Sequence, residues 1–385
     1  MDPRSAPARG AAMSTAPAWG EAPARAGALG TPGAGVGSKA GSAGGAGAGA
    51  DVWRVQAEDG AWRALLDGLA AGAGASAGEG AAGEGGGLGG SGPARACYRA
   101  LALFKLRRFV EAEQAASAGA DRRQPFALQW LHAELPAHTG SPAEALERLY
   151  ALLGHCRERG SPSGEPLPQP PQPGVSGAQA AGEGPAEGVS AWERRHDFVL
   201  YSLVRHHLGR GEFFAALQLL SWLLDHRGRP TAALAMVVRV LLQVGDVRAA
   251  NGALLELEAR VGGLDDAADP ARAEGLRTRA LVQFANLQYV EAGATLDAVL
   301  KERPWDVVAC NNRAVSQMYS KDIVGAINRL EGSLRQFPHQ MLREGFVGNL
   351  ASLYELSSAD APGAKRQLAQ WAMEFAPDDF DVAKF

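Results

Sequence analysis

Histidine and acidic side chains are the first candidates for chemistry in this chain. His196, His206 and His207 fall within one predicted helix, and histidines that share a helix face can bind a metal ion. His206 and His207 are neighbours in sequence, however, so their side chains point about 100° apart around the helix. That geometry is poor for a shared metal ion, and we expect a packing or solvated role for both.

His132 and Glu134 are a second candidate, because a histidine and a carboxylate together can act as an acid/base pair. Residues two positions apart on a helix point to different sides, which makes such a pair improbable. We expect helix capping or hydrogen bonding between repeated elements of the fold instead.

Motifs for cofactors are missing or out of context. Residues 45–50 fit a loose GxGxxA pattern but lie in a low-complexity tract with no strand before them, and GxxxxGK[ST], HExxH and GxSxG do not occur. Cys97, Cys156 and Cys310 show no CxxC spacing, which argues against a disulfide framework and a zinc site. We therefore predict no enzyme activity, no catalytic residue, no cofactor, no metal site and no small-molecule substrate.

A repeat of 34 residues organises the chain. Pro304 and Pro338 are 34 residues apart, and Ala280 pairs with Ala314 at the same interval. This period is typical of the tetratricopeptide (TPR) helix pair, which must stack on its neighbours to bury its apolar face. The sequence therefore predicts a recognition surface.

Small residues mark the place where the two helices of each pair cross closely, at positions 8 and 20 of the repeat. With Ala273 as position 1, position 8 is Ala280 and position 20 is Ala292. The position-20 alanines are separated by 33, 71, 34, 42 and 34 residues, and they are Ala112, Ala145, Ala216, Ala250, Ala292 and Ala326. A further pair is predicted between His339 and Pro377, with its second helix from Ala364 to Phe375, giving about seven pairs.

The expected fold is an all-α, TPR-type α-solenoid with a disordered Gly/Ala-rich leader and a disordered Pro/Gly-rich insert, since such compositions do not offset the entropy of ordering. A short amphipathic helix predicted at residues 51–70 is expected to pack as an extra half-unit at the start of the solenoid or to dock on a partner. The predicted segments are a leader at 1–50, a short amphipathic helix at 51–70, a Gly-rich linker at 71–92, two repeats at 93–160, the insert at 161–190, the remaining repeats at 191–377 and a tail at 378–385.

The formal net charge of −4 supplies no basic field to attract nucleic acid. The most apolar run, 232–244, is broken by Arg239 and too short to cross a membrane. We expect protein partners, without nucleic acid and without direct membrane insertion.

Positions 2, 5, 9 and 12 of each first helix line the concave face of a TPR superhelix. Two predicted first helices place a mixed, fairly apolar set of residues there, which suits a protein segment or a neighbouring subunit. The set needed to grip a free carboxylate, Lys-x3-Asn, Asn and Lys-x3-Arg on successive helices, is absent. The predicted partner-binding residues are Glu274, Arg277, Leu281, Phe284, Val308, Asn311, Val315 and Met318.

Several short runs follow one another along the chain and together carry a family resemblance. Two of them owe nothing to the TPR consensus: residues 131–135, Leu-His-Ala-Glu-Leu, and residues 349–358, which begin Asn-Leu and end Tyr-Glu-Leu-Ser-Ser. Others include Trp62-Arg63-Ala64, the run at 101–106, and Asn311-Asn312-Arg313-Ala314-Val315. In this order, over roughly residues 60 to 358, the runs resemble the family of subunit 12 of the trafficking protein particle (TRAPP) complex.

The resemblance implies a non-catalytic, cytoplasmic scaffold subunit of an assembly that tethers vesicles and promotes nucleotide exchange on Rab GTPases, peripheral to membranes of the endoplasmic reticulum and Golgi. A chaperone-linked TPR adaptor is the alternative, and an enzyme with appended repeats ranks third because the repeats leave no room for a catalytic domain of about 100 residues.

Overall fold

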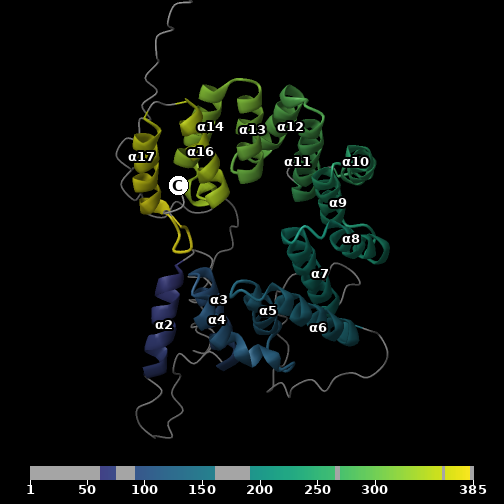
Figure 1. The fold of residues 1–385 in the computed structure, drawn as a ribbon, viewed down its shortest axis with the longest axis vertical. Helices are drawn as coiled ribbons and strands as arrows, with labels where there is room; N and C mark the ends of the chain where they lie inside the picture. Colours follow the sequence, from purple (N-terminus) through teal and green to yellow (C-terminus); the bar gives the residue numbers. More distant parts are fainter. Residues whose placement is uncertain (1–60, 75–91, 161–190, 265–268, 358–359, 382–385) are drawn as a thin grey trace, which may run out of the picture. The chain divides into compact units, whose positions relative to one another are not determined.

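A computed structural model describes residues 61–74, 92–160, 191–264, 269–357 and 360–381, and all regular elements in these ranges are helices (Figure 1). The described residues fall into two compact units, one ending at Thr278 and the other beginning at Arg279, so that the division lies within one helix, α11. Each unit is described by itself below.

Consecutive helices form seven pairs in the described ranges, which confirms the predicted all-α TPR solenoid. The pairs are α3 (Gly92–Lys105) with α4 (Phe109–Ala116), α5 (Phe126–Glu134) with α6 (Pro142–Gly160), α7 (Ala191–Gly209) with α8 (Phe213–His226), α9 (Thr231–Val244) with α10 (Val247–Val261), α11 (Pro270–Ala285) with α12 (Tyr289–Glu302), α13 (Val307–Tyr319) with α14 (Ile323–Gln336), and α16 (Glu344–Ser357) with α17 (Ala361–Phe375). Short helices η1 (Ser117–Ala120), η2 (Leu135–Ala137) and α15 (Pro338–Met341) lie between them.

The alanines of the repeat pattern are buried within the helix pairs. Ala112, Ala145, Ala216 and Ala250 have no exposed surface in the first unit. In the second unit Ala280, Ala292 and Ala326 are also fully buried, and Ala314 is 1% exposed. A methyl group at these points lets the two helix backbones approach closely, as the pattern predicts.

Tight turns join the two helices in each of the first six pairs, and each turn places one residue in the left-handed region two positions before the second helix. Glycine takes this position in three turns, where it meets no Cβ clash. The six residues are Arg107, Gly140, Gly211, Gly245, Leu287 and Lys321.

An additional helix, α2 (Trp62–Gly74), packs on α3. Trp62, Leu65 and Leu69 are buried against Ala102 of that helix. A helix of this length is marginal alone in water, so its order depends on this contact. Half of the predicted segment at 51–70, namely 51–60, lies outside the described residues, as do the predicted leader, most of the linker and the whole insert at 161–190.

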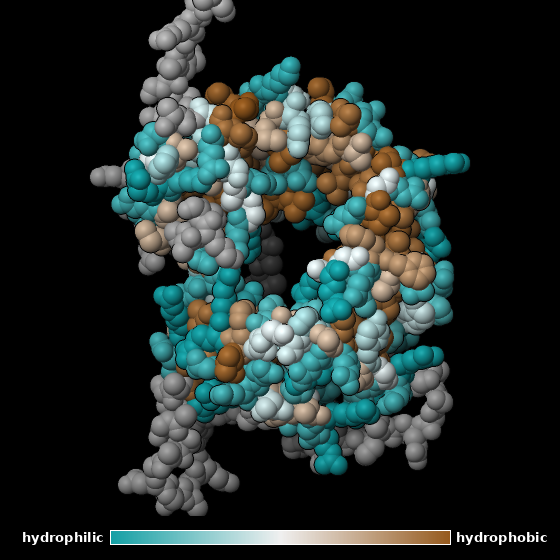
Figure 2. Space-filling model, in the orientation of Figure 1, coloured by the Kyte–Doolittle hydropathy of each residue, from teal (hydrophilic) through white to brown (hydrophobic). Residues whose placement is uncertain are grey.

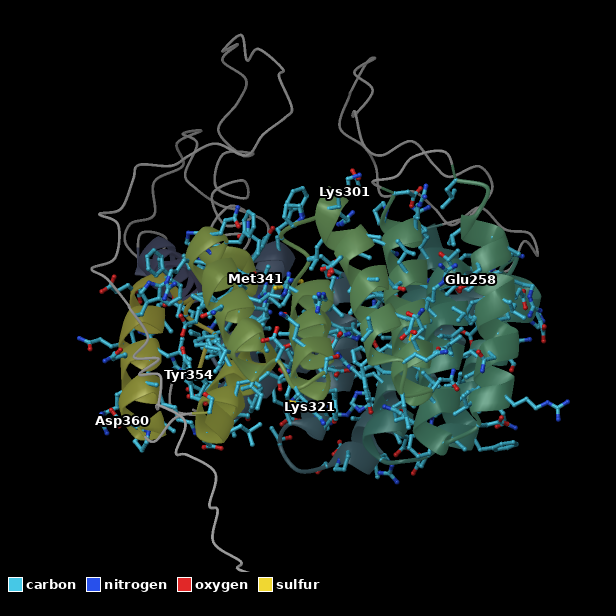
Figure 3. All side chains as sticks on the ribbon, turned by 90° about the horizontal axis from the view of Figure 1, so that it is seen from above. Glu258, Lys301, Lys321, Met341, Tyr354 and Asp360 are labelled. Carbon is cyan, nitrogen blue, oxygen red and sulfur yellow. The ribbon has the colours of Figure 1, made fainter. Side chains whose placement is uncertain are left out.

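In the unit that begins at Arg279, α13, α14, α16 and α17 enclose one core, which includes Leu330, Met341, Leu350 and Leu368. Pro304 lies between α12 and α13, whereas Pro338 is the first residue of α15. Figure 3 shows Lys301, near the end of α12, and Lys321, just beyond α13, at opposite edges, as antiparallel neighbours require.

None of the helices in the described part of the chain combines the length and hydrophobicity needed to span a lipid bilayer.

Candidate functional site

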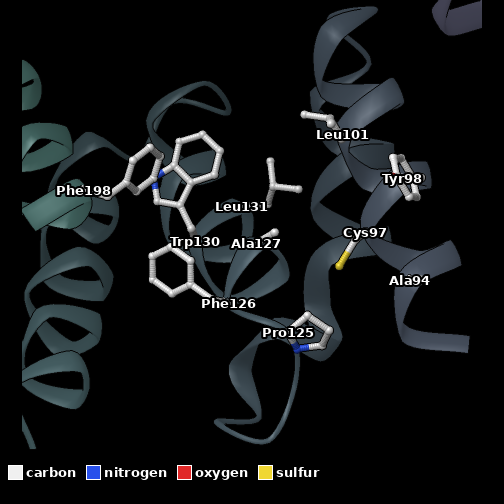
Figure 4. Close-up of a pocket in the computed structure, with 10 residues that line it drawn as sticks. All are labelled: Ala94, Cys97, Tyr98, Leu101, Pro125, Phe126, Ala127, Trp130, Leu131 and Phe198. Atoms are coloured by element: carbon white, nitrogen blue, oxygen red, sulfur yellow. The ribbon is translucent and has the colours of Figure 1, made fainter. Parts of the chain in front are cut away.

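An apolar groove lies across three first helices of the unit that ends at Thr278 (Figure 4). Its volume is about 650 Å³, which is in the range of pockets that accept small molecules or peptide side chains. Helix α3 provides one wall, α5 the middle and α7 the other wall. The lining residues are Ala94, Cys97, Tyr98, Leu101, Pro125, Phe126, Ala127, Trp130, Leu131 and Phe198.

The repeat register explains why these side chains meet. Counting back from the position-20 alanines, position 2 of the first three helix pairs is Ala94, Ala127 and Phe198, and position 5 of the first two is Cys97 and Trp130. All five line the groove. The groove is therefore on the face that a TPR solenoid uses for recognition.

Three aromatic rings fill the side of the groove between α5 and α7. The ring centroid of Phe198 lies 5.4 Å from that of Trp130 and 6.0 Å from that of Phe126, in edge-to-face arrangements. Nε1 of Trp130 donates a hydrogen bond to Oγ of Ser202, 3.1 Å away. The indole is thus satisfied inside the protein and presents only carbon to the groove. Phe198 is 46% exposed, although it belongs to this aromatic cluster.

The positively charged side chain of Arg195 lies at the edge of the groove near the start of α7. The guanidinium carbon of Arg195 is 5.5 Å from the ring centroid of Phe126 and 4.4 Å from that of Trp192, within cation–π range. The guanidinium of Arg159 also lies over the Trp192 ring, at 5.2 Å. Among the described residues, no carboxylate is paired with Arg195.

The opposite edge of the groove carries a buried carboxylate, Glu134, that is paired with the exposed Arg205. Glu134, one turn beyond Trp130 on α5, is 1% exposed and accepts hydrogen bonds from Arg205 and, at 3.0 Å, from Nε2 of His206. His138 lies 3.9 Å away. Burial alone would raise the pKa of Glu134, but the rings of His138 and His206 and the charge of Arg205 outweigh it and hold the pKa at about 2. Glu134 therefore stays ionised and ties α5 to α7.

His132 and Glu134 are not an acid/base pair, as expected from their spacing. Arg148 donates a hydrogen bond of 2.9 Å to the carbonyl oxygen of His132, whereas the carboxylate of Glu134 accepts a hydrogen bond from Arg205 of α7. His206 and His207 also have separate partners. Nδ1 of His207 donates to Glu212 at 2.7 Å. Within the described residues, no group of three histidine, cysteine or acidic side chains could hold a metal ion.

Cys97 is the one cysteine of the described chain that lines the groove, since Cys156 and Cys310 are buried in helix cores. Burial raises the pKa of the Cys97 thiol. A thiol with a raised pKa is a weak nucleophile, so Cys97 contributes apolar surface. The groove as a whole can bind apolar groups, but its lining offers no arrangement of acid, base and nucleophile.

The comparisons with known proteins point to one kind of protein. No family model matches the chain. Over 259 residues, the chain is 27% identical to "Trafficking protein particle complex subunit 12" of Mus musculus and 25% identical to the protein of that name from Homo sapiens. This chain is similar to TRAPP complex subunit 12. The resemblance inferred from the sequence is thereby confirmed.

The matched region is 67% of this chain and 32% of the mouse subunit 12, or 34% of the human one, so that the chain spans about a third of the length of the curated relatives it matches. A solved tetratricopeptide repeat protein from Parabacteroides merdae covers 74% of this chain and 93% of its own, at 13% identity and a TM-score of 0.44. The assignment of the fold rests on the helix pairs of the chain itself.

The predicted partner-binding residues lie on α11 and α13. Glu274 and Arg277, in the unit that ends at Thr278, form an ion pair of 2.5 Å with each other, and Glu274 also pairs with Arg239 of α9. These ion pairs within the fold largely neutralise the charges of Glu274 and Arg277. That these two residues bind a partner stays a prediction.

The other six belong to the unit that begins at Arg279. Val308 is 51% exposed, whereas Met318 packs against the core of that unit. Oδ1 of Asn311 accepts a hydrogen bond of 2.8 Å from Nδ2 of Asn349 on α16. Leu281, Phe284 and Val315 are half-buried. Their role in binding also stays a prediction.

Sequence reasoning missed the groove because the position rule was applied only to the pairs beginning at Ala273 and Val307. The same rule, counted from Ala112, Ala145 and Ala216, names five of the lining residues. The available signal was the run of small or aromatic residues at positions 2 and 5, which contrasts with the polar Glu274 and Asn311 at those positions farther along the chain.

Proposed function

We propose that this chain is a non-catalytic TPR scaffold that binds other protein subunits of a TRAPP-type assembly acting in vesicle tethering and Rab nucleotide exchange between the endoplasmic reticulum and the Golgi. The observation that carries this proposal is the similarity to subunit 12 over 259 residues. The apolar groove supports it, since an exposed hydrophobic recess on a solenoid suits a protein partner.

In this proposal the chain is cytoplasmic and reaches ER and Golgi membranes through the complex. It needs no cofactor and turns over no small molecule. Exchange on Rab GTPases is carried out by other, smaller subunits, and the solenoid holds partners in place.

Purification of the tagged protein from its own cells at near-physiological salt tests the proposal. We expect several TRAPP subunits to elute with it in a high-molecular-weight fraction, in stable proportion by mass spectrometry. A free monomer, or chaperones as the sole companions, would contradict the scaffold role and favour the chaperone-linked adaptor.

A further inference from the structure

We propose that the groove between α3, α5 and α7 binds an amphipathic α-helix of a partner protein, with apolar side chains in the groove and a carboxylate of that helix on Arg195. This inference rests on the proposed scaffold function and specifies the partner segment. It differs from the recognition of a charged chain terminus, for which the chain lacks the clamp residues.

The hydrogen-bonding capacity of the groove decides the conformation of the occupant. An extended peptide needs partners for its backbone N–H and C=O groups, and leaving such groups buried without partners is costly. The lining is almost entirely hydrocarbon: its one indole N–H is already donated to Ser202, and its other polar side-chain groups are the Tyr98 hydroxyl and the Cys97 thiol. A helix satisfies its own backbone and presents only side chains, so it is the conformation that fits.

The length of the groove determines the length of the bound helix and the spacing of its apolar residues. Neighbouring helices pack about 9 Å apart, so a groove across three first helices extends roughly 20 Å. A helix of that length has about 13 residues, enough for apolar anchors at i, i+3 or i+4, and i+7. Tyr98 and Leu101 on one wall and Phe198 on the other stand where such anchors would make contact.

The charges at the two edges of the groove determine which charged residue the partner helix carries beside its apolar anchors. At one edge, Arg205 is already paired with Glu134, so its charge is balanced within the protein. At the other edge, Arg195 carries a positive charge above the ring of Phe126 without a carboxylate among the described residues. A carboxylate beside the apolar anchors would complete this edge, and a lysine there would be repelled.

A photo-crosslink in the intact complex identifies the occupant. A diazirine-bearing amino acid replaces Ala127, an exposed small residue of the lining, in the protein expressed in its own cells. Ala232 has the same repeat position on α9, is also exposed and lies outside the lining, so it is the matched control. We expect Ala127 to crosslink to a partner segment with the i, i+3/i+4, i+7 apolar pattern and an acidic residue, and Ala232 not to crosslink to it.

A synthetic peptide of the crosslinked segment then tests the contacts by fluorescence anisotropy and circular dichroism. We expect Arg195→Glu to weaken its binding at least tenfold, and a peptide with lysine in place of the acidic residue to restore binding to that variant. Arg248→Glu, an equal change of charge on exposed α10 surface, should alter binding less than twofold. The peptide should gain helicity on binding.

Three results would overturn the inference: a crosslinked segment that is extended or Pro-rich, a crosslink to a second copy of this chain, or equal binding by the wild type and the Arg195→Glu variant. If TRAPP subunits co-purify but the groove crosslinks to none of them, the inference fails while the scaffold function stands. If no TRAPP subunit co-purifies and a helix of another protein is crosslinked, the scaffold function fails and the groove assignment stands.

Discussion

The first helices of the two compact units present different surfaces at equivalent repeat positions. Position 2 of α3, α5 and α7 and position 5 of α3 and α5 supply small and aromatic residues that form the groove. On α13, the same positions are Val308 and Asn311, and Asn311 is hydrogen-bonded to Asn349 of α16. The repeat thus fixes where a side chain points, whereas the residue type decides what it can bind.

The outer surfaces of helices show that exposed apolar residues alone do not define the site. Figure 2 shows hydrophobic surface over α8 to α10 as well. There Phe214 is 74% exposed and Leu255 is 67% exposed. Phe214 lies beside Leu217 and Trp222 of the same helix, α8, whereas the groove gathers apolar residues from three helices.

The largest expected effect is on the ion pair at the groove edge. Glu134→Gln should lower the free energy of unfolding of its unit by on the order of 3 kcal/mol at pH 7, given a folded pKa of about 2 against an ordinary value of 4.5. Because the folded pKa is lowered, this stability is present above about pH 5 and is lost as the pH falls toward 2. Amide hydrogen exchange of α5 and α7 at pH 7 and pH 3 measures it.

Glu147→Gln is the control for this change, since Glu147 is exposed on α6 of the same unit, and its effect should stay below about 0.5 kcal/mol. Faster exchange in α14 and α16 of the other unit would show that the effect of Glu134→Gln is not local. An equal loss of stability at pH 3 would show that ionisation of Glu134 is not its cause.

The next effect concerns binding at the apolar face. Phe198→Ala should weaken association with the partner subunits at least tenfold, about 1.4 kcal/mol, because it removes the aromatic wall of the groove. Pull-down from cell extract with quantitative mass spectrometry measures it. Phe214→Ala, a more exposed phenylalanine outside the groove, should have no such effect. Equal losses for the two variants would remove the distinction between groove and outer surface.

A smaller effect is expected in the turns. Lys321 has a φ of 68° and Gly245 a φ of 89°. A residue with a Cβ is strained at such positive φ values, whereas glycine is not. Lys321→Gly should therefore stabilise the second unit by about 0.5–1 kcal/mol, and Gly245→Ala should destabilise the first by about 1 kcal/mol. Thermal unfolding by calorimetry measures both, and a loss of stability in Lys321→Gly would mean that chain entropy outweighs the strain.

The smallest effect is expected at the amide pair. Asn349→Ala removes an exposed hydrogen bond to Asn311, so stability should fall by at most about 0.5 kcal/mol and partner association by less than twofold. The same pull-down measures association. A tenfold loss of association would indicate that the partner binds at α13 and α16 and not in the groove.

The fold was predictable from the sequence because its signals are local. A methyl-sized residue at Ala112 or Ala292 and a proline after a helix act within one pair, and the 34-residue period repeats them. Boundaries were less accurate: α17 begins at Ala361, three residues before the predicted start at Ala364, since Asp360 accepts a hydrogen bond from the backbone N–H of Gly363 and caps the helix earlier.

The site was only partly predictable, because it depends on contacts between pairs. The pairing of Glu134 with Arg205 joins residues 71 positions apart across the insert, and no local pattern reports it. Hydrogen bonding between repeats was expected for Glu134, but its partner was not. The freedom of Arg195 from ion pairs within the described chain is likewise a property of the packed helices.

The hydrogen bond from Trp130 to Ser202 has a consequence for how this surface can change over evolutionary time. Since the indole is satisfied inside the protein, a partner has no indole N–H to match, and exchanging one apolar anchor for another leaves that donor paired. Such an interface tolerates drift in both proteins as long as shape and one charge persist. Orthologous partners could then diverge widely in sequence and still be exchanged between species.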